Sequence, residues 1–321
     1  MDELLVRRNV VACGLGYKVT NGRQTDELSL MVSVTRKVPR AELSPQDVIP
    51  QAVSGLPTDV VETGRIRALA LEDPRARWRP APPGVSIGHR DITAGTFGLL
   101  VFREGRSYIL SNNHILADSN AAKTGDPIYQ PSPADGGTAN ERIATLVEFE
   151  PLDFGDSPAE CAVARTLADI LNWIASHSGS QHRLEPIRQT TGTNLMDAAL
   201  ALPDQPDLVK PEILGIGTPV GIAEPELGQV VQKMGRTSGL TQGTVTQISV
   251  TVDVDYGGRT ARFTDQVFAG PMSSPGDSGS SVLTLDRHVV GLLFAGSEQV
   301  TIFTPIRRIL DRFDITLLAA D

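Results

Sequence analysis

The residues of this chain best suited to chemistry lie at 276–279, in the order Gly-Asp-Ser-Gly. Glycines beside a serine allow a tight turn whose backbone passes close to a bound carbonyl group and whose N–H groups point toward one spot. The hydroxyl of Ser278 could attack the carbonyl carbon there, while the N–H groups of Gly276 and Ser278 hold the oxygen that becomes negative. The same short pattern is common in ordinary turns, so a catalytic interpretation also needs a base for Ser278.

A histidine upstream could be that base. Residues 107–117 form a β-type run that passes through small polar residues to His114. Histidine is the side chain most often used to take up and return a proton near neutral pH. A histidine at the end of a strand is more often a satisfied polar residue than a base. The presence of a second motif with a candidate nucleophile favours the catalytic interpretation.

Together the two motifs resemble the chymotrypsin-like (trypsin-like) serine peptidases, whose catalytic residues follow the chain order His, Asp, Ser. The Leu-Ser-Asn-Asn-His box at 110–114, the segment 194–201 and the N-terminal segment 14–19 are similar, more narrowly, to a group of intracellular bacterial trypsin-like peptidases related to plant proteins. The resemblance implies a serine endopeptidase that hydrolyses protein or peptide substrates through an acyl-enzyme. It also implies two six-stranded Greek-key barrels with the active site between them, and no cofactor.

Two acidic residues compete to be the carboxylate that would orient His114. Glu160 and Asp197 each precede a short apolar run, and Glu160 lies at the more usual distance after the histidine. Residues 157–160, however, read Ser-Pro-Ala-Glu, a capping box with proline at the first helical position. With the apolar spacing that follows, this pattern predicts an amphipathic helix, inserted around 157–177, that already uses Glu160. Asp197 precedes a run that a proline stops, as a strand would be, so we favour Asp197.

The resemblance also suggests a substrate pocket. In the family, an acidic residue six positions before the serine selects basic side chains, and here that position holds a methionine. The facing strand carries a phenylalanine where the family has a small polar residue. We therefore expect a small or medium uncharged side chain before the cleaved bond. The residues assigned to this pocket are Met272, Ser273, Phe294, Ala295 and Gly296.

The acid before the serine raises a question of activation. In many secreted relatives this residue, here Asp277, pairs with a newly cut N-terminus, yet the chain has no Arg-Ile-Val-Gly-Gly-like cleavage site. We therefore expect activity to depend on the N-terminal module, on self-association or on a partner.

The chain is expected to be mainly β, in three parts. Residues 84–321 alternate short β-like runs with glycine-rich turns, a pattern typical of an antiparallel barrel or sandwich, and form the peptidase domain. Residues 1–64 form a small α/β module, with a helix expected after Ser44 as cap and proline at its first position. The Pro- and Arg-rich segment 65–83 is expected to be a linker. Whether the helical insertion covers the cleft or an oligomer contact stays open.

The composition limits the partners. A net charge of −9 and a pI near 5.1 argue against a surface that tracks nucleic acid phosphates. No apolar run is long enough to cross a membrane, and the first residues lack the charge pattern of a secretory leader. Two cysteines, Cys13 and Cys161, indicate no disulfide framework and so a reducing compartment, the cytoplasm. The histidines are not spaced as metal ligands usually are, so the sequence predicts no metal site. Homo-oligomerisation is left open.

Two rival functions remain beside the endopeptidase. One is a protein-binding scaffold with an idle peptidase fold, and the other is a protein that cleaves itself once. The presence of all three candidate catalytic residues disfavours the idle scaffold.

Overall fold

The structure is a computed structural model that describes residues 2–20, 23–64, 66, 73–92, 94–158, 161–189 and 192–317. Contacts within the chain divide it into two compact units, Met1–Glu72 and Asp73–Asp321. The division falls inside the segment 65–83 that we expected to be a linker. Its second half is not a linker. Ala81 is fully buried, and the backbone N–H of Trp78 donates to the Gln130 side chain at 2.9 Å, so this part belongs to the larger unit.

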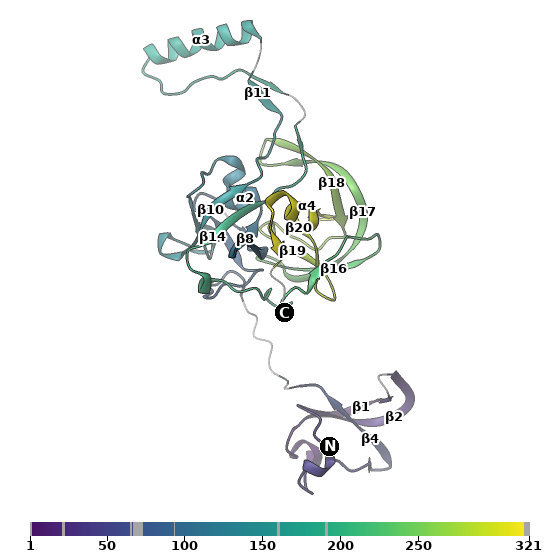
Figure 1. The fold of residues 1–321 in the computed structure, drawn as a ribbon. Coiled ribbons are helices and arrows are strands. Elements are labelled where there is room, and N and C mark those ends of the chain that lie inside the picture. Colours follow the sequence, from purple (N-terminus) through teal and green to yellow (C-terminus); the bar gives the residue numbers. More distant parts are fainter. Residues whose placement is uncertain are drawn as a thin grey trace. The chain divides into compact units, whose positions relative to one another are not determined.

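The first unit is built on a four-stranded sheet in the order β1-β2-β4-β3 (Figure 1). Strands β1 and β2 are antiparallel, and β4 runs parallel to β2. Leu4, Leu30 and Val32 form its small buried core. The bounds are α1 (Asp2–Leu5), β1 (Val10–Thr20), β2 (Arg23–Val34), the 3-10 helix η1 (Arg40–Glu42), β3 (Ala52–Val53) and β4 (Leu56–Glu62).

The helix expected after Ser44 does not form. The Ser44 hydroxyl donates to the Asp47 carboxylate at 2.6 Å, and the Asp47 N–H donates to the Ser44 carbonyl at 2.9 Å. These bonds close a turn, because the serine side chain binds another side chain and caps no free backbone N–H group. The module is therefore mainly β.

Six strands of the second unit close into a ring. Each strand pairs antiparallel with the next in the order β16-β17-β18-β21-β20-β19, and β19 pairs with β16. This order joins sequence neighbours by hairpins and brings the last strand back beside the third, which is a Greek-key arrangement. The bounds are β16 (Val230–Gly235), β17 (Gly239–Asp255), β18 (Thr260–Ala269), β19 (Ser281–Thr284), β20 (His288–Gly296) and β21 (Thr301–Pro305).

A second curled sheet of the same unit repeats that order. Its strands run β7-β8-β14-β10-β9-β5. When the six strands of each sheet are numbered along the chain, both sheets have the spatial order 2-3-6-5-4-1. The bounds are β5 (Ser86–His89), β7 (Leu99–Arg103), β8 (Arg106–Ser111), β9 (Pro127–Tyr129), β10 (Arg142–Phe149) and β14 (Ala199–Pro203). The expected pair of Greek-key β-barrels is thus confirmed, and we call them the first barrel (β5 to β14) and the second barrel (β16 to β21).

Short elements complete the barrels. The helix α4 buries four apolar side chains, including Ile309 and Phe313, in the largest core cluster. The remaining elements are β6 (Gly95–Thr96), α2 (Asn113–Leu116), η2 (Asp118–Asn120), η3 (Pro133–Asp135), η4 (Ala139–Glu141), β13 (Thr193–Asn194), η5 (Pro206–Leu208), β15 (Gly221–Ile222), α4 (Ile306–Phe313) and β22 (Thr316–Leu317).

The expected helical insertion is present, but it begins differently. Ser157 and Pro158 belong to strand β11 (Asp156–Pro158), which pairs with β12 (Ile187–Gln189), and so they do not cap the helix. The helix α3 (Ala162–His177) starts after Cys161, because strand pairing takes up the backbone groups that a capped helix would have used. Glu160, and with it the expected capping box, lies outside the described residues. Figure 1 shows α3 standing away from the barrels.

The apolar stripe of α3 faces solvent. Val163, Leu167, Ile170 and Ile174 are each half exposed or more, whereas Ala168 on the opposite side is buried. An amphipathic helix usually turns its apolar side toward its own core. Here α3 presents that side outward instead.

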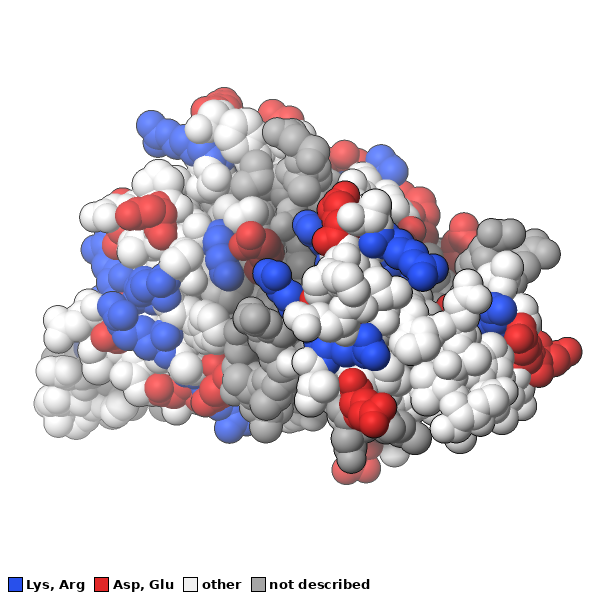
Figure 2. All heavy atoms as spheres, turned by 90° about the horizontal axis from the view of Figure 1, so that it is seen from below, with Lys and Arg blue, Asp and Glu red and all other residues white. Residues whose placement is uncertain are grey.

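Charge on the surface is mixed. Figure 2 shows Lys and Arg side chains lying among Asp and Glu side chains on the face in view. Several of these groups form ion pairs, such as Arg142 with Asp204 at 2.8 Å. Among the described residues, no helix is both long and apolar enough to cross a membrane.

Candidate active site

The pairing of β8 with β14 brings His114 and Asp197 together. Ser111 at the end of β8 lies opposite Ala199 at the start of β14, so the residues that follow one strand meet those that precede the other. The Nδ1 atom of His114 lies 2.5 Å from Oδ2 of Asp197. The backbone N–H of His114 also donates to Oδ1 of Asp197 at 3.2 Å. The carboxylate thus fixes both the ring and the backbone of the histidine.

Asp197 is buried and receives further hydrogen bonds. Its side chain has no exposed surface, its backbone carbonyl accepts from the Asn112 amide at 2.7 Å, and its Oδ2 accepts from the Tyr256 hydroxyl at 2.8 Å. Burial, and then the neighbouring charge of Asp197, raise the pKa of Tyr256 well above the ordinary value of a phenol. Tyr256 therefore keeps its proton. Sequence reasoning missed Tyr256 because it lies in a turn of the second barrel with no pattern to mark it.

The serine comes from the second barrel. Ser278 lies in the loop between β18 and β19, and this loop contacts the first barrel through Thr96. The Thr96 N–H donates to the Ser278 carbonyl at 2.8 Å, and its hydroxyl donates to the Gly276 carbonyl at 3.0 Å. At Gly279, which has φ +94°, a Cβ atom would lie 2.2 Å from the hydroxyl oxygen of Ser111. Only glycine allows the loop to approach the first barrel so closely.

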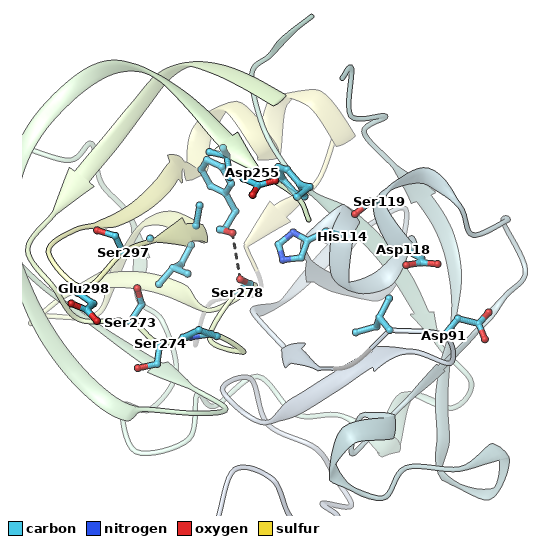
Figure 3. Close-up of a pocket in the computed structure, with 18 residues that line it drawn as sticks. Asp91, His114, Asp118, Ser119, Asp255, Ser273, Ser274, Ser278, Ser297 and Glu298 are labelled. Carbon is cyan, nitrogen blue, oxygen red and sulfur yellow. Dashed lines mark hydrogen bonds between the residues drawn. The ribbon is translucent and has the colours of Figure 1, made fainter. Parts of the chain in front are cut away.

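Ser278 and His114 line the same cavity, as Figure 3 shows. The hydroxyl of Ser278 donates to the backbone carbonyl of Phe294 at 3.3 Å, marked by the dashed line in Figure 3. Within the described part of the chain, no hydrogen bond joins Ser278 to His114. Catalytic hydrogen bonds are often long or misaligned before substrate binds.

Two backbone N–H groups of the serine loop, those of Gly276 and Ser278, bind no other group in the described part of the chain. The N–H of Asp277 donates to the Ser274 carbonyl at 2.9 Å, and that of Gly279 donates to the Leu293 carbonyl at 2.8 Å. The N–H groups of Gly276 and Ser278 donate to no group among the described residues. Gly276 has φ +97°, a conformation that glycine adopts without strain. These are the two donors expected to hold an oxyanion.

A buried ion pair anchors this loop. The Lys233 ammonium lies 3.0 Å from Oδ2 of Asp277, and neither side chain has exposed surface. Oδ1 of Asp277 accepts the N–H groups of Thr237 at 2.8 Å and Ser238 at 3.1 Å, and Oδ2 accepts that of Ser274 at 2.9 Å. One carboxylate thus binds the start of the serine loop, at Ser274, and the turn between β16 and β17, at Thr237 and Ser238.

The ionisation of this pair follows from its surroundings. Burial alone would raise the pKa of Asp277, but Lys233 and the hydrogen bonds outweigh it and hold that pKa below its usual value. Burial lowers the pKa of Lys233, and the carboxylate opposes this shift. Sequence reasoning considered Asp277 and missed its partner. The available signal was a lysine inside a predicted strand, which must be paired if it is buried.

The cavity has a volume of about 1070 Å³. Of the residues assigned to the substrate pocket, Ser273, Phe294, Ala295 and Gly296 line it. Met272 does not. It is 3% exposed and packs in the core of the second barrel, and its N–H donates to the Thr301 hydroxyl at 3.1 Å. None of the described residues of α3 lines the cavity.

Four acidic residues line the cavity, and its walls include no lysine or arginine among the described residues. Figure 3 labels all four, namely Asp91, Asp118, Asp255 and Glu298. The charge of Asp91 is partly balanced by Arg90, whose Nε lies 3.1 Å from its Oδ2. No group of three or more His, Cys, Asp or Glu side chains in the described ranges is arranged to hold a metal ion.

Comparison with known proteins finds similarity in structure alone. No family model matches the chain, and no curated protein matches its sequence. Among solved structures, Thermobifida fusca Protease A covers 74% of this chain with 98% of its own length, at 17% identity and a TM-score of 0.47. The fold is similar to that of serine proteases.

Two further solved structures agree with that result. A glutamic acid specific serine protease covers 74% of this chain with 99% of its own length, at 17% identity and a TM-score of 0.46. Cellulomonas bogoriensis chymotrypsin covers 74% of this chain with 98% of its own length, at 16% identity and a TM-score of 0.45. At such identities the similarity concerns the fold, and the function proposed below rests on the site itself.

Proposed function

We propose that this protein is a serine endopeptidase with Ser278, His114 and Asp197 as its catalytic triad. The observation that carries the proposal is the buried carboxylate of Asp197, which lies 2.5 Å from the ring of His114. His114 and Ser278 line the same cavity. A buried carboxylate holds a histidine in the tautomer that can accept a proton at its other nitrogen.

The geometry supports acyl transfer in two steps. Oγ of Ser278 attacks the peptide carbonyl, His114 takes the hydroxyl proton, and the N–H groups of Gly276 and Ser278 stabilise the oxyanion. His114 then gives the proton to the leaving amine, and the acyl group stays on Ser278. Water attacks this ester with His114 again as base, which releases the second product. Attack requires the Ser278 hydroxyl to turn from the Phe294 carbonyl toward His114.

The partners follow from the same site. The substrate is a protein or peptide, and the mechanism uses neither metal nor cofactor. Cys13 and Cys161 are both free thiols, which supports a reducing compartment, and we assign the protein to the cytoplasm. The mixed charge of the surface supports binding neither to nucleic acid nor to membrane.

The first test is covalent labelling by a fluorophosphonate probe. We expect the wild-type protein to be labelled, and Ser278→Ala and His114→Ala to lose labelling, since the probe needs an activated hydroxyl. Ser178→Ala and His182→Ala, both on the exposed insertion, are matched controls that should label normally. Labelling retained in Ser278→Ala would refute the assignment. No labelling of the wild type would favour the idle scaffold, in which Ser278 stays bonded to Phe294.

Substrate preference is a second prediction. Ser273, Ala295 and Gly296 present small surfaces without charge, so we expect small or medium uncharged side chains before the cleaved bond. Acidic side chains should be the poorest, because the pocket residues offer them no positive charge. A peptide library varied at this position should show at least about tenfold higher kcat/KM for uncharged than for acidic residues. A strong preference for Arg or Lys would contradict the assignment of the pocket.

A further inference from the structure

We propose that Tyr256 is a positioning residue that holds Asp197, and through it His114, from the second barrel. The inference rests on the proposed function, because it concerns the same triad. Tyr256 follows the end of β17, whereas Asp197 and His114 belong to the first barrel. A phenol that reaches across the boundary between the barrels thus completes the surroundings of the buried carboxylate.

Hydrogen bonds fix the carboxylate from opposite sides. Oδ1 of Asp197 accepts the backbone N–H of His114, and Oδ2 accepts both the His114 ring at 2.5 Å and the Tyr256 hydroxyl at 2.8 Å. The other described donors to this carboxylate come from the first barrel. Without Tyr256, rotation of the carboxylate is opposed by the histidine alone. Tyr256 therefore limits the orientations that the acid, and hence the imidazole, can adopt.

The direction of the bond is set by chemistry. An ionised carboxylate can only accept hydrogen bonds, so the phenol must donate. Burial and the charge of Asp197 raise the pKa of Tyr256, so it remains a donor throughout the neutral range. The ring edge also packs against the ring of His114, with centroids 5.7 Å apart and an interplanar angle of 77°. Tyr256 thus touches both members of the pair.

The turn that carries Tyr256 is well supported. Its backbone N–H donates to the Arg259 carbonyl at 2.8 Å, which closes the β17–β18 hairpin. Its ring packs against Phe154, with centroids 5.6 Å apart, and against Phe263, with centroids 6.2 Å apart. These contacts fix the ring independently of its hydroxyl, so Tyr256→Phe can remove the hydrogen bond and leave the packing in place.

The loss of this bond has a defined electrostatic consequence. A hydrogen bond to a carboxylate draws away part of its negative charge, so removing the donor leaves more charge beside His114. That charge stabilises the imidazolium form. We therefore expect the acid limb of the kcat/KM profile of Tyr256→Phe to move to higher pH, and the proton between Nδ1 of His114 and Asp197 to resonate further downfield. Looser positioning should also lower kcat/KM about 10- to 100-fold, the range for a lost bond to a charged group.

The deciding experiment is ¹H NMR of the proton between His114 and Asp197 in the full-length wild type, Tyr256→Phe and Tyr129→Phe, followed by pH profiles of kcat/KM. Tyr129 lies on β9 and lines no part of the cavity, so its variant is the matched control. A downfield shift of this proton signal in Tyr256→Phe only, with a shifted acid limb, is the expected result. A variant with 3-fluorotyrosine at 256, a stronger donor, should move the signal the opposite way.

An unmoved proton signal in Tyr256→Phe would overturn the inference, as would a loss of rate with an unshifted acid limb and a lowered Tm. The NMR measurement needs no turnover. A wild type that is not labelled by fluorophosphonate would therefore refute the proposed function and still leave the role of Tyr256 decided by the proton signal.

Discussion

Replacing Asp197 by asparagine should lower kcat about 10⁴-fold with little change in fold. The amide can donate toward Nδ1 of His114, which favours the tautomer whose other nitrogen carries the proton and cannot accept one from Ser278. Because the side chain is buried, no water can take over the role of the carboxylate. The measurement is kcat on a peptide substrate, together with the rate of fluorophosphonate labelling.

The control for this prediction is the rival acid. Glu160→Gln makes the same change from acid to amide, and it should leave kcat and labelling within about twofold of the wild type, as expected for a residue outside the chemistry. A large loss in Glu160→Gln with activity retained in Asp197→Asn would reverse the assignment of the third catalytic residue.

Replacing Lys233 by methionine should lower the free energy of unfolding by about 3–5 kcal/mol. Methionine fills most of the volume but leaves the carboxylate of Asp277 buried without a positive charge. The loop that presents Ser278 depends on that carboxylate, so labelling should also be lost. Urea denaturation at pH 7 measures the change. The double variant Lys233→Met with Asp277→Asn removes the unpaired charge and should recover much of the stability.

The pH dependence gives an independent check. Because the pKa of Asp277 is held below its unfolded value of about 4, its contribution to stability is present above that value and is lost as the pH falls through the folded pKa. In Lys233→Met, protonation instead relieves an unpaired charge, so stability should fall less steeply between pH 7 and 3. A single variant within about 1 kcal/mol of the wild type would show that the pair contributes little.

Local patterns were enough to single out Ser278 and His114 as candidates. A tight turn with glycines and a strand that ends in polar residues are encoded by neighbouring residues, so they can be recognised without knowledge of tertiary contacts. The same reasoning indicated Asp197, which precedes a short strand, and the structure places it beside His114. Positions inside a single element or turn are therefore predictable.

Contacts between distant elements were not predictable. Tyr256 meets Asp197 across 59 positions of sequence, and Lys233 meets Asp277 across 44. Nothing local to either residue marks its partner. A comparison of motifs shows which residue occupies a given family position, but it does not show the direction of that residue's side chain. Met272 was therefore assigned to the pocket although it lies in the core.

The two Greek-key barrels were expected from the family resemblance, not from the periodicity of the strands. Both curled sheets use one strand order. Core positions require only apolar side chains that fill the volume, so many unrelated sequences satisfy one topology. Ser157 and Pro158 show the converse, since they pair with β12 although their sequence is typical of a helix start.

The pairing of Lys233 with Asp277 also bears on when this protein could begin to work. Both partners belong to the second barrel and its loop, so the turn that presents Ser278 takes its shape as that barrel folds. No newly cut amine is needed to fill the place of the lysine. For the proposed peptidase, this predicts that the loop of Ser278 takes its shape in the full-length chain without proteolytic processing.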